Sequence, residues 1–328
     1  MSQVCVTQRI FPEAIELLQA ENLSHSYHES DQALDSHDLN EAIKGCEGLI
    51  CLITDKVDAV LMDQAPNLKV IANVAVGYDN IDVAAASERG IVVTNTPDVL
   101  TETTADLTFA LLLAAARRIP EADTYMRSGQ FKEFKLYQPQ IGVDVFGKTL
   151  GIVGMGRIGT AVARRGALGF GMKVLYTANS SKPEAEKELG AKQVTFEELL
   201  KESDFISINT PSTPETHHLF TLKEFEQMKR SAFLINAARG PIVKEDDLAE
   251  ALESGLIQGA GIDVFEREPL IDSKLAQLKK HVVVAPHIGS ASVETRRNMS
   301  LMAAQNVISA LKGQCPPNAL NPEIWKDV

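Results

Sequence analysis

The sequence has few cysteines and no arrangement of them that would hold a metal ion. They are Cys5, Cys46, Cys51 and Cys315. Without a CxxC pair or a Cys/His pattern, these thiols are expected to be free, forming neither a disulfide nor a zinc site. The adjacent His217 and His218 do not indicate a metal site, because neighbouring side chains point in different directions and no acidic residue lies at ligand spacing. We therefore expect no metal.

The chain also lacks an excess of positive charge and any long apolar run. It has 32 Lys and Arg against 44 Asp and Glu, for a net charge of -12 and a pI near 5.1. This balance opposes nucleic acid or anionic membrane as a partner, since both require clustered cations. No basic segment followed by an apolar run opens the sequence, and no stretch of about 20 apolar residues occurs. We expect a soluble, cytoplasmic protein.

Short apolar runs alternate with helix-like stretches along most of the 328 residues, a pattern typical of parallel α/β architecture. The length suits two domains. In the first part, strands are expected at residues 4–7, 48–53, 69–76 and 91–96. A long helix is expected at 101–118, with Thr101 as its N-cap, and a last helix at 293–311. Six further strands are expected at 149–153, 173–177, 205–209, 232–236, 259–264 and 281–285.

A glycine loop, Gly154-Met-Gly-Arg-Ile-Gly159, joins the first of these six strands to a helical run at 160–168. The spacing alone is a weak signal, but a strand-to-helix turn is where helix N–H groups can face a pyrophosphate. Gly154 permits the tight turn, Gly156 lets the backbone approach phosphate, and Gly159 lets the helix pack close to the strand. The loop predicts a bound dinucleotide.

The strand after the glycine loop lacks the acidic residue that would bind an adenosine ribose. Residues 172–183 carry only neutral or basic side chains, with Asn179 and Ser180 where a 2′-phosphate would lie. Because an acid there disfavours NADP, its absence predicts NADP(H) as the preferred cofactor. Use of NAD(H) as well stays open, since no arginine occupies this stretch.

Three residues whose side chains could take part in catalysis follow strands of the expected second sheet. Arg239 follows 232–236, Glu268 follows 259–264, and His287 follows 281–285. Reduction of a ketone by hydride needs an acid for the forming alkoxide and a cation for the substrate carboxylate. Singly, such residues are more often capping or surface groups, but their common edge of the sheet favours a catalytic site.

The sequence resembles the D-isomer-specific 2-hydroxyacid dehydrogenase family across nearly its whole length, and is most similar to its glyoxylate/hydroxypyruvate reductases, which include 2-ketogluconate reductase. The matching stretches are residues 76–82 (VGYDNID), 154–159 (GMGRIG), 236–240 (NAARG), 263–269 (DVFEREP) and 286–290 (PHIGS). The resemblance implies a Rossmann cofactor domain at 101–287, inserted into a flavodoxin-like substrate domain formed by 1–100 and 288–328. Both would be doubly wound parallel-sheet domains.

The resemblance implies that His287 is the general acid/base, Glu268 its hydrogen-bonded partner and Arg239 the substrate anchor. Glu266 lies only two residues from Glu268, which is chosen because it directly precedes Pro269, as in the family motif. Substrate contacts are implied at Val76, Gly77, Arg239, His287 and Ser290. Cofactor contacts are implied at Thr104, Gly154, Gly156, Arg157, Ile158, Gly159, Pro211, Thr216, Ala237, Ala238, Arg239, Asp263, His287 and Gly289. Asp263 could instead cap a neighbouring helix.

The implied activity is the NAD(P)H-dependent reduction of glyoxylate, hydroxypyruvate or 2-ketogluconate to D-2-hydroxy acids such as glycolate and D-glycerate. The resemblance also implies a homodimer built through residues 101–148. The aromatic residues Phe131, Phe134 and Tyr137 fit such an arm, although packing in the core explains them equally well.

Rival interpretations remain. Another D-2-hydroxyacid dehydrogenase of the same family is one. Three further classes are disfavoured: formate dehydrogenases have glutamine in place of Glu268, phosphite-oxidising relatives have lysine in place of Val76, and L-specific dehydrogenases carry their glycine loop near the N-terminus rather than mid-chain. A dinucleotide-sensing corepressor of the same fold could retain all three candidate catalytic residues.

Overall fold

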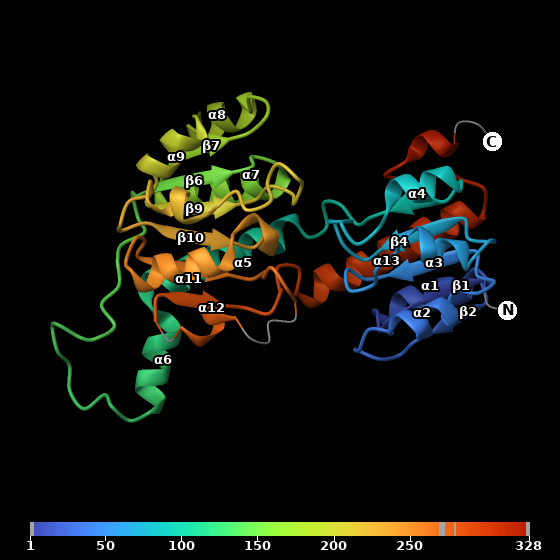
Figure 1. Cartoon of the computed structure of the whole chain (residues 1–328), viewed down its shortest axis with the longest axis horizontal. Coiled ribbons are helices and arrows are strands. Elements are labelled where there is room, and N and C mark those ends of the chain that lie inside the picture. The colour runs from blue at the N-terminus through green and yellow to red at the C-terminus, as the bar shows by residue number, and fades with distance from the viewer. Residues whose placement is uncertain (1–2, 269–272, 279, 326–328) are drawn as a thin grey trace. The chain divides into compact units, whose positions relative to one another are not determined.

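The computed structural model describes residues 3–268, 273–278 and 280–325 and divides the chain into two compact units (Figure 1). Met1–Leu100 and Ser290–Val328 form the first unit, and Thr101–Gly289 forms the second, which is therefore an insertion in the first. The second boundary lies two residues beyond the one expected after residue 287. Pro269, used above to choose Glu268, lies outside the described residues.

The first unit contains a parallel sheet in the order β2-β1-β3-β4-β5. This is the flavodoxin-like order of a doubly wound sheet, which confirms the expected fold class. Sequence analysis misses β2, because its three residues form a polar, half-buried edge strand. The strands are β1 (Val4–Val6), β2 (His25–Tyr27), β3 (Gly48–Cys51), β4 (Val70–Asn73) and β5 (Val92–Thr94).

Helices cover both faces of this first sheet. One core layer packs α1 and α13 against it, and the other packs α2, α3 and α4. The C-terminal tail returns to β5, where the Leu320 amide donates to the Val93 carbonyl (2.8 Å). The helices are α1 (Pro12–Ala20), α2 (Ser36–Ala42), α3 (Ala59–Asp63), α4 (Val83–Glu88), α13 (Val293–Leu311) and the 3-10 helix η3 (Pro322–Trp325).

The second unit contains a parallel sheet in the order β12-β11-β10-β9-β6-β7-β8. Its central order is the Rossmann pattern, with reversal between β6 and β9, and β12 extends it. The expected six strands are present, and the short exposed β8 is a seventh. They are β6 (Thr149–Val153), β7 (Lys173–Thr177), β8 (Lys192–Gln193), β9 (Phe205–Ile208), β10 (Phe233–Asn236), β11 (Gly259–Ile262) and β12 (Val282–Val284).

Two core layers sandwich the second sheet, one under α5 and α7 and the other under α9, α11 and α12. α5 ends at Arg117, because Arg118 adopts a left-handed φ of 54° and α6 begins after it. α7 begins at Arg157, directly after Gly156 and earlier than expected. The helical elements are α5 (Thr101–Arg117), α6 (Ile119–Arg127), α7 (Arg157–Arg164), η1 (Arg165–Gly169), α8 (Pro183–Leu189), α9 (Phe196–Glu202), α10 (Leu222–Phe225), η2 (Gly240–Ile242), α11 (Glu245–Glu253) and α12 (Lys274–Gln277).

The segment after α6 projects from the second sheet as a long loop before the chain returns to β6 (Figure 1). Phe131, Phe134 and Tyr137 are 41%, 78% and 86% exposed, so core packing within this chain does not explain them. Among the described residues, no helix combines the length and the hydropathy needed to cross a bilayer.

Candidate active site

The carboxyl ends of neighbouring strands bring the candidate catalytic residues to one edge of the second sheet. Arg239 follows β10, Glu268 follows β11 and His287 follows β12, and these three strands are adjacent and parallel. The glycine loop follows β6 on the same edge. In doubly wound sheets this edge, at the point where strand order reverses, is where ligands bind.

His287 and Glu268 form a direct hydrogen-bonded pair. The Nδ1 of His287 lies 2.7 Å from Oε2 of Glu268, and the other carboxylate oxygen accepts the Phe265 amide at 2.9 Å. Burial disfavours the Glu268 carboxylate, but the His287 and Phe265 hydrogen bonds and the charge of Arg239 outweigh it and hold the pKa of Glu268 below its usual value. A carboxylate placed in this way stabilises a protonated imidazole.

Asp263 holds the backbone on which His287 is mounted. This side chain is fully buried, and its two oxygens accept the amides of Ile288 and Gly289, each at 2.8 Å. The His287 amide in turn donates to the Asp263 carbonyl, and His287 has a left-handed φ of 53°. Since α13 has its own cap at Ser292, Asp263 is no helix cap. Its carboxylate fixes an unfavourable backbone conformation at His287, and burial raises the pKa of Asp263.

Arg239 is held by an asparagine turn. The Nδ2 of Asn236 donates to the Arg239 carbonyl at 2.9 Å, and its Oδ1 accepts the Ala238 amide at 3.1 Å. Asn236 is 1% exposed at the end of β10, so these bonds replace its contacts with water. Asn236 is a supporting residue to which sequence reasoning assigned no role, although a buried asparagine ending a strand before a turn is the signal for one.

The three loop glycines meet different surroundings. A Cβ on Gly154, whose φ is 95°, would lie 2.8 Å from the Asn209 carbonyl, and one on Gly159 would lie 2.2 Å from the Gly154 carbonyl. At Gly156 a Cβ would meet nothing within 4 Å. The N-cap residue Gly156 makes no side-chain bond to the first turn of α7, whose N–H groups are the kind of donors that bind a pyrophosphate.

Thr104 lies in the first turns of α5, next to Gly289 and Asp263. A Cβ on Gly289 would lie 3.4 Å from Thr104 Cγ2 and 3.4 Å from Asp263 Oδ2.

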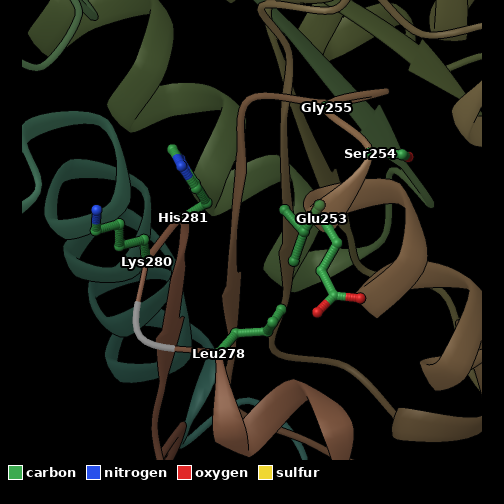
Figure 2. Close-up of a pocket in the computed structure, with 7 residues that line it drawn as sticks. Glu253, Ser254, Gly255, Leu278, Lys280 and His281 are labelled. Atoms are coloured by element: carbon green, nitrogen blue, oxygen red, sulfur yellow. The ribbon is translucent and has the colours of Figure 1, made fainter.

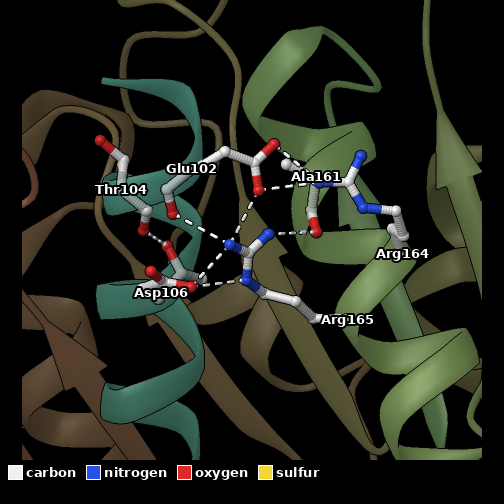
Figure 3. Close-up of polar contacts among 7 residues, drawn as sticks. Glu102, Thr104, Asp106, Ala161, Arg164 and Arg165 are labelled. Carbon is white, nitrogen blue, oxygen red and sulfur yellow. Dashed lines mark hydrogen bonds and ion pairs between the residues drawn. The ribbon is translucent and has the colours of Figure 1, made fainter. Parts of the chain in front are cut away.

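An ion network joins this end of α5 to α7 (Figure 3). Arg164 donates to both oxygens of Glu102 and lowers the pKa of that carboxyl, and Arg165 donates to Asp106 at 2.6 and 2.8 Å. The network therefore fixes the helix carrying Thr104 against the helix that follows the glycine loop.

The other expected cofactor contacts lie on loops of the same edge. The Thr216 hydroxyl donates to the Pro211 carbonyl at 2.7 Å, which closes the loop after β9. Asn179 and Ser180 are exposed just after β7. Glu186 of α8 accepts bonds from the hydroxyls of Tyr176 at 2.6 Å and Ser181 at 3.3 Å. Ala237 and Ala238 follow β10 in the turn before Arg239, and Arg157 and Ile158 form the first turn of α7.

The expected substrate residues Val76 and Gly77 belong to the first unit, in the turn after β4. The Nδ2 of Asn95 donates to the Val76 carbonyl and that of Asn73 to the Gly77 carbonyl, both at 2.8 Å. These bonds fix the backbone of the turn. Ser290 also belongs to the first unit, as the first residue of its returning segment.

Sequence reasoning missed a second pair of histidine and glutamate. The Nε2 of His218 lies 2.5 Å from Oε1 of Glu266, so His218 has an acidic partner 48 residues away along the chain. Sequence spacing could not reveal this partner. Of the two neighbouring glutamates, Glu268 contacts His287 and Glu266 contacts His218.

A cavity of about 440 Å³ lies away from these groups (Figure 2). It is lined by Glu253 and Ser254 at the end of α11 and by Lys280 and His281 before β12. Those positions are at the amino end of β12, whereas His287 follows its carboxyl end. The cavity therefore belongs to the opposite edge of the sheet.

The Rossmann strand order and the glycine loop define a dinucleotide-binding protein. The family model described as D-isomer specific 2-hydroxyacid dehydrogenase, NAD binding domain, matches residues 109–289. This chain belongs to that family, and its cofactor is a nicotinamide dinucleotide.

Similar proteins cover nearly the whole chain. A glyoxylate reductase from Thermococcus litoralis is 54% identical over 289 residues, 87% of each chain. A crystal structure of a Thermus thermophilus protein is 46% identical with a TM-score of 0.91, covering 97% of this chain and 99% of that one. An NADPH-dependent glyoxylate/hydroxypyruvate reductase from Sinorhizobium meliloti, crystallised with NADP and malonate, is 33% identical with a TM-score of 0.82 and coverages of 97% and 96%.

Proposed function

We propose that this protein reduces small 2-keto acids to D-2-hydroxy acids with NADPH. Glyoxylate and hydroxypyruvate are the foremost substrates, and 2-ketogluconate is a larger one. The single observation that carries the proposal is the 2.7 Å contact between His287 and Glu268 on the strand edge that also bears Arg239. The names of the similar proteins support glyoxylate as the substrate.

His287 supplies the proton in the proposed reaction. Its Nδ1 is bound by Glu268, which leaves Nε2 as the atom that gives a proton to the substrate carbonyl oxygen. The Glu268 carboxylate stabilises the imidazolium before transfer and holds the ring in one orientation. When bound, the dinucleotide supplies the hydride to the carbonyl carbon.

Arg239 anchors the substrate carboxylate in this proposal. A guanidinium offers a planar set of donors that can bind a carboxylate and polarise the adjacent carbonyl together, which an ammonium group cannot match. The backbone amides of Val76 and Gly77 are proposed as further donors to the carboxylate, and Ser290 as an additional substrate contact.

The proposed preference for NADPH rests on the surroundings of Asn179 and Ser180. Residues 172–183 contain no acid, and Lys182 Nζ lies 3.3 Å from Ser180 Oγ. Glu186 lies outside this range, but its carboxylate accepts bonds from the hydroxyls of Tyr176 and Ser181 and therefore borders the stretch. In this proposal the Asn179 amide, the Ser180 hydroxyl and the Lys182 ammonium group are the donors to a 2′-phosphate.

Steady-state rates with glyoxylate, hydroxypyruvate, 2-ketogluconate, pyruvate and phenylpyruvate, each with NADPH and NADH, test the proposal. We expect the highest kcat/KM for glyoxylate or hydroxypyruvate with NADPH. Asn179→Asp places an acid beside the ribose site and should shift the preference toward NADH. A wild-type preference for NADH would contradict the cofactor assignment, and negligible rates on the small 2-keto acids would contradict the substrate assignment.

A further inference from the structure

The Glu266 side chain fastens three loops at the carboxyl edge of the second sheet. Its Oε1 contacts His218 Nε2 at 2.5 Å, and its Oε2 accepts the Glu245 amide at 3.0 Å, the first of α11. The Glu266 amide donates back to the Glu245 carboxylate at 3.2 Å. Loops after β9, β10 and β11 therefore meet at one carboxylate.

The loops after β9 and β10 are also joined through their backbones. The His218 amide donates to the Pro241 carbonyl at 2.8 Å, and the Phe220 amide donates to the Ile242 carbonyl at 3.1 Å. This short ladder begins two residues after Arg239. Movement at His218 is consequently transmitted to the turn that presents Arg239.

The loops after β10 and β11 leave no space between them. A Cβ on Gly240, the neighbour of Arg239, would lie 1.9 Å from the carbonyl carbon and oxygen of Phe265 and 2.5 Å from the Glu266 nitrogen. The backbone next to Arg239 therefore rests directly on the backbone that leads to Glu268.

Adjacent amides in the Phe265–Glu266 backbone donate to two carboxylates of this edge. The Phe265 amide donates to Glu268, the partner of His287, and the Glu266 amide donates to Glu245. A displacement of Glu266 thus moves the donor that orients the Glu268 carboxylate. Since His218 and Glu266 side chains are only 31% and 30% exposed, water replaces their bond less readily than it would at the surface.

We propose that His218 and Glu266 are positioning residues that hold Glu268 and Arg239 in the geometry needed for proton transfer and substrate anchoring. This inference rests on the proposed reduction of 2-keto acids. The two residues act through backbone and neighbouring side chains. Their effect should therefore be on kcat and on KM for the keto acid, with affinity for the dinucleotide retained.

Three variants separate positioning from a merely structural role. Glu266→Ala removes both acceptors, Glu266→Gln keeps an acceptor for Glu245 and offers an amide donor to His218, and His218→Asn is too short to reach Glu266. Asparagine is chosen because His218 has a left-handed φ of 51°, which asparagine tolerates. His37→Ala is the matched control, since His37 also contacts an acid, Asp38, but in the first unit and 82% exposed.

Misplacement of a reacting group by about 1 Å can cost roughly 10²-fold in rate, so we expect a loss of this order in kcat for Glu266→Ala. KM for glyoxylate should rise, and NADPH affinity by fluorescence titration should stay unchanged. Glu266→Gln should recover most of kcat, His218→Asn should resemble Glu266→Ala, and His37→Ala should match wild type. Unchanged kcat and KM in Glu266→Ala, or equal losses in its Ala and Gln variants, would overturn the proposal.

Amide hydrogen exchange at Phe265 tests the same inference without turnover. We expect exchange roughly tenfold faster in Glu266→Ala than in wild type or Glu266→Gln, because loss of the Glu266 bonds loosens the backbone that holds the Phe265 amide against Glu268. Equal exchange in all three proteins would overturn the proposal even if the wild type is active. Wild-type inactivity on every keto acid would instead contradict the proposed function, and Phe265 exchange would still decide whether Glu266 fixes the loop.

Discussion

Asp263 and Glu268 are neighbouring carboxyl groups whose pKa values are displaced in opposite directions. Burial raises the pKa of Asp263, while the His287 hydrogen bond offsets burial at Glu268 and lowers its pKa. The two groups therefore have different tasks. Asp263 holds backbone amides beneath His287, and Glu268 keeps its negative charge against the imidazole.

The lowered pKa of Glu268 predicts a pH dependence of stability. A carboxyl group with a depressed folded-state pKa stabilises the fold fully above its unfolded value, near 4.5, and loses that contribution as pH falls through the folded value. Glu268→Gln should therefore unfold at lower denaturant concentration than wild type at pH 6, with the difference shrinking below about pH 4.5.

Denaturant titrations of both proteins at several pH values measure this difference. The exposed Glu253→Gln serves as the control and should show no such trend. A constant difference between wild type and Glu268→Gln across the whole pH range would contradict the assigned charge pairing.

For individual residues, the sequence allows the candidate catalytic side chains to be predicted but not the side chains that support them. Arg239, Glu268 and His287 are recognisable because each follows a strand on one sheet edge. The contact of His218 with Glu266 depends on how loops after β9 and β11 pack, which no local pattern encodes. The hydrogen bonds from backbone amides to the Asp263 carboxylate likewise depend on the pairing of β11 with β12, which the sequence does not show.

Among the elements, the buried parallel strands are the most predictable. β6 and β7 match their expected ranges because each is an apolar run bounded by polar residues. The edge strands β2 and β8 were missed, because short polar strands lack that pattern and pair only through their neighbours. The helix α13 also matches its expected range, whereas the left-handed Arg118 that ends α5 leaves no signal in composition.

In the turn between β6 and α7, the same substitution at two glycines is expected to change different properties, the stability at Gly159 and the cofactor affinity at Gly156. Gly159→Ala places a methyl group 2.2 Å from the Gly154 carbonyl and should destabilise the protein by about 1–3 kcal/mol. Gly156→Ala places the methyl group in open space, so the stability should not change. The methyl group would hinder the close approach of the backbone to phosphate, so NADPH binding should weaken by roughly tenfold, about 1.4 kcal/mol.

Thermal unfolding and fluorescence titration of NADPH distinguish these two variants. A stable Gly156→Ala protein with wild-type affinity would contradict the placement of the pyrophosphate at this turn. A Gly159→Ala protein with unchanged stability would contradict the close packing of α7 on β6.

For the whole molecule, the exposed apolar arm is the feature that a single chain does not explain. Phe134, Leu136, Tyr137 and Phe146 are 75–86% exposed in the segment between α6 and β6. Exposed apolar patches of this kind mark protein interfaces, and we propose that the arm forms a homodimer contact.

Light scattering after size-exclusion chromatography tests the dimer. The wild type should have the mass of two 35.7 kDa chains, and the double variant Phe134→Asp and Leu136→Asp should shift toward monomer. Val60→Asp, a similarly exposed apolar site in the first unit, should leave the mass unchanged. A monomeric wild type, or a dimer unaffected by the arm variant, would contradict this interface.

The central claim is that His287 gives a proton to a small 2-keto acid as the dinucleotide is oxidised. The most direct measurement is the rate of NADPH oxidation with glyoxylate for wild type and His287→Asn, beside NADPH affinity for both. Because positioned proton transfer contributes about 10²–10⁴-fold, kcat should fall by that factor while NADPH affinity is retained. An active wild type whose turnover survives His287→Asn unchanged would contradict the account.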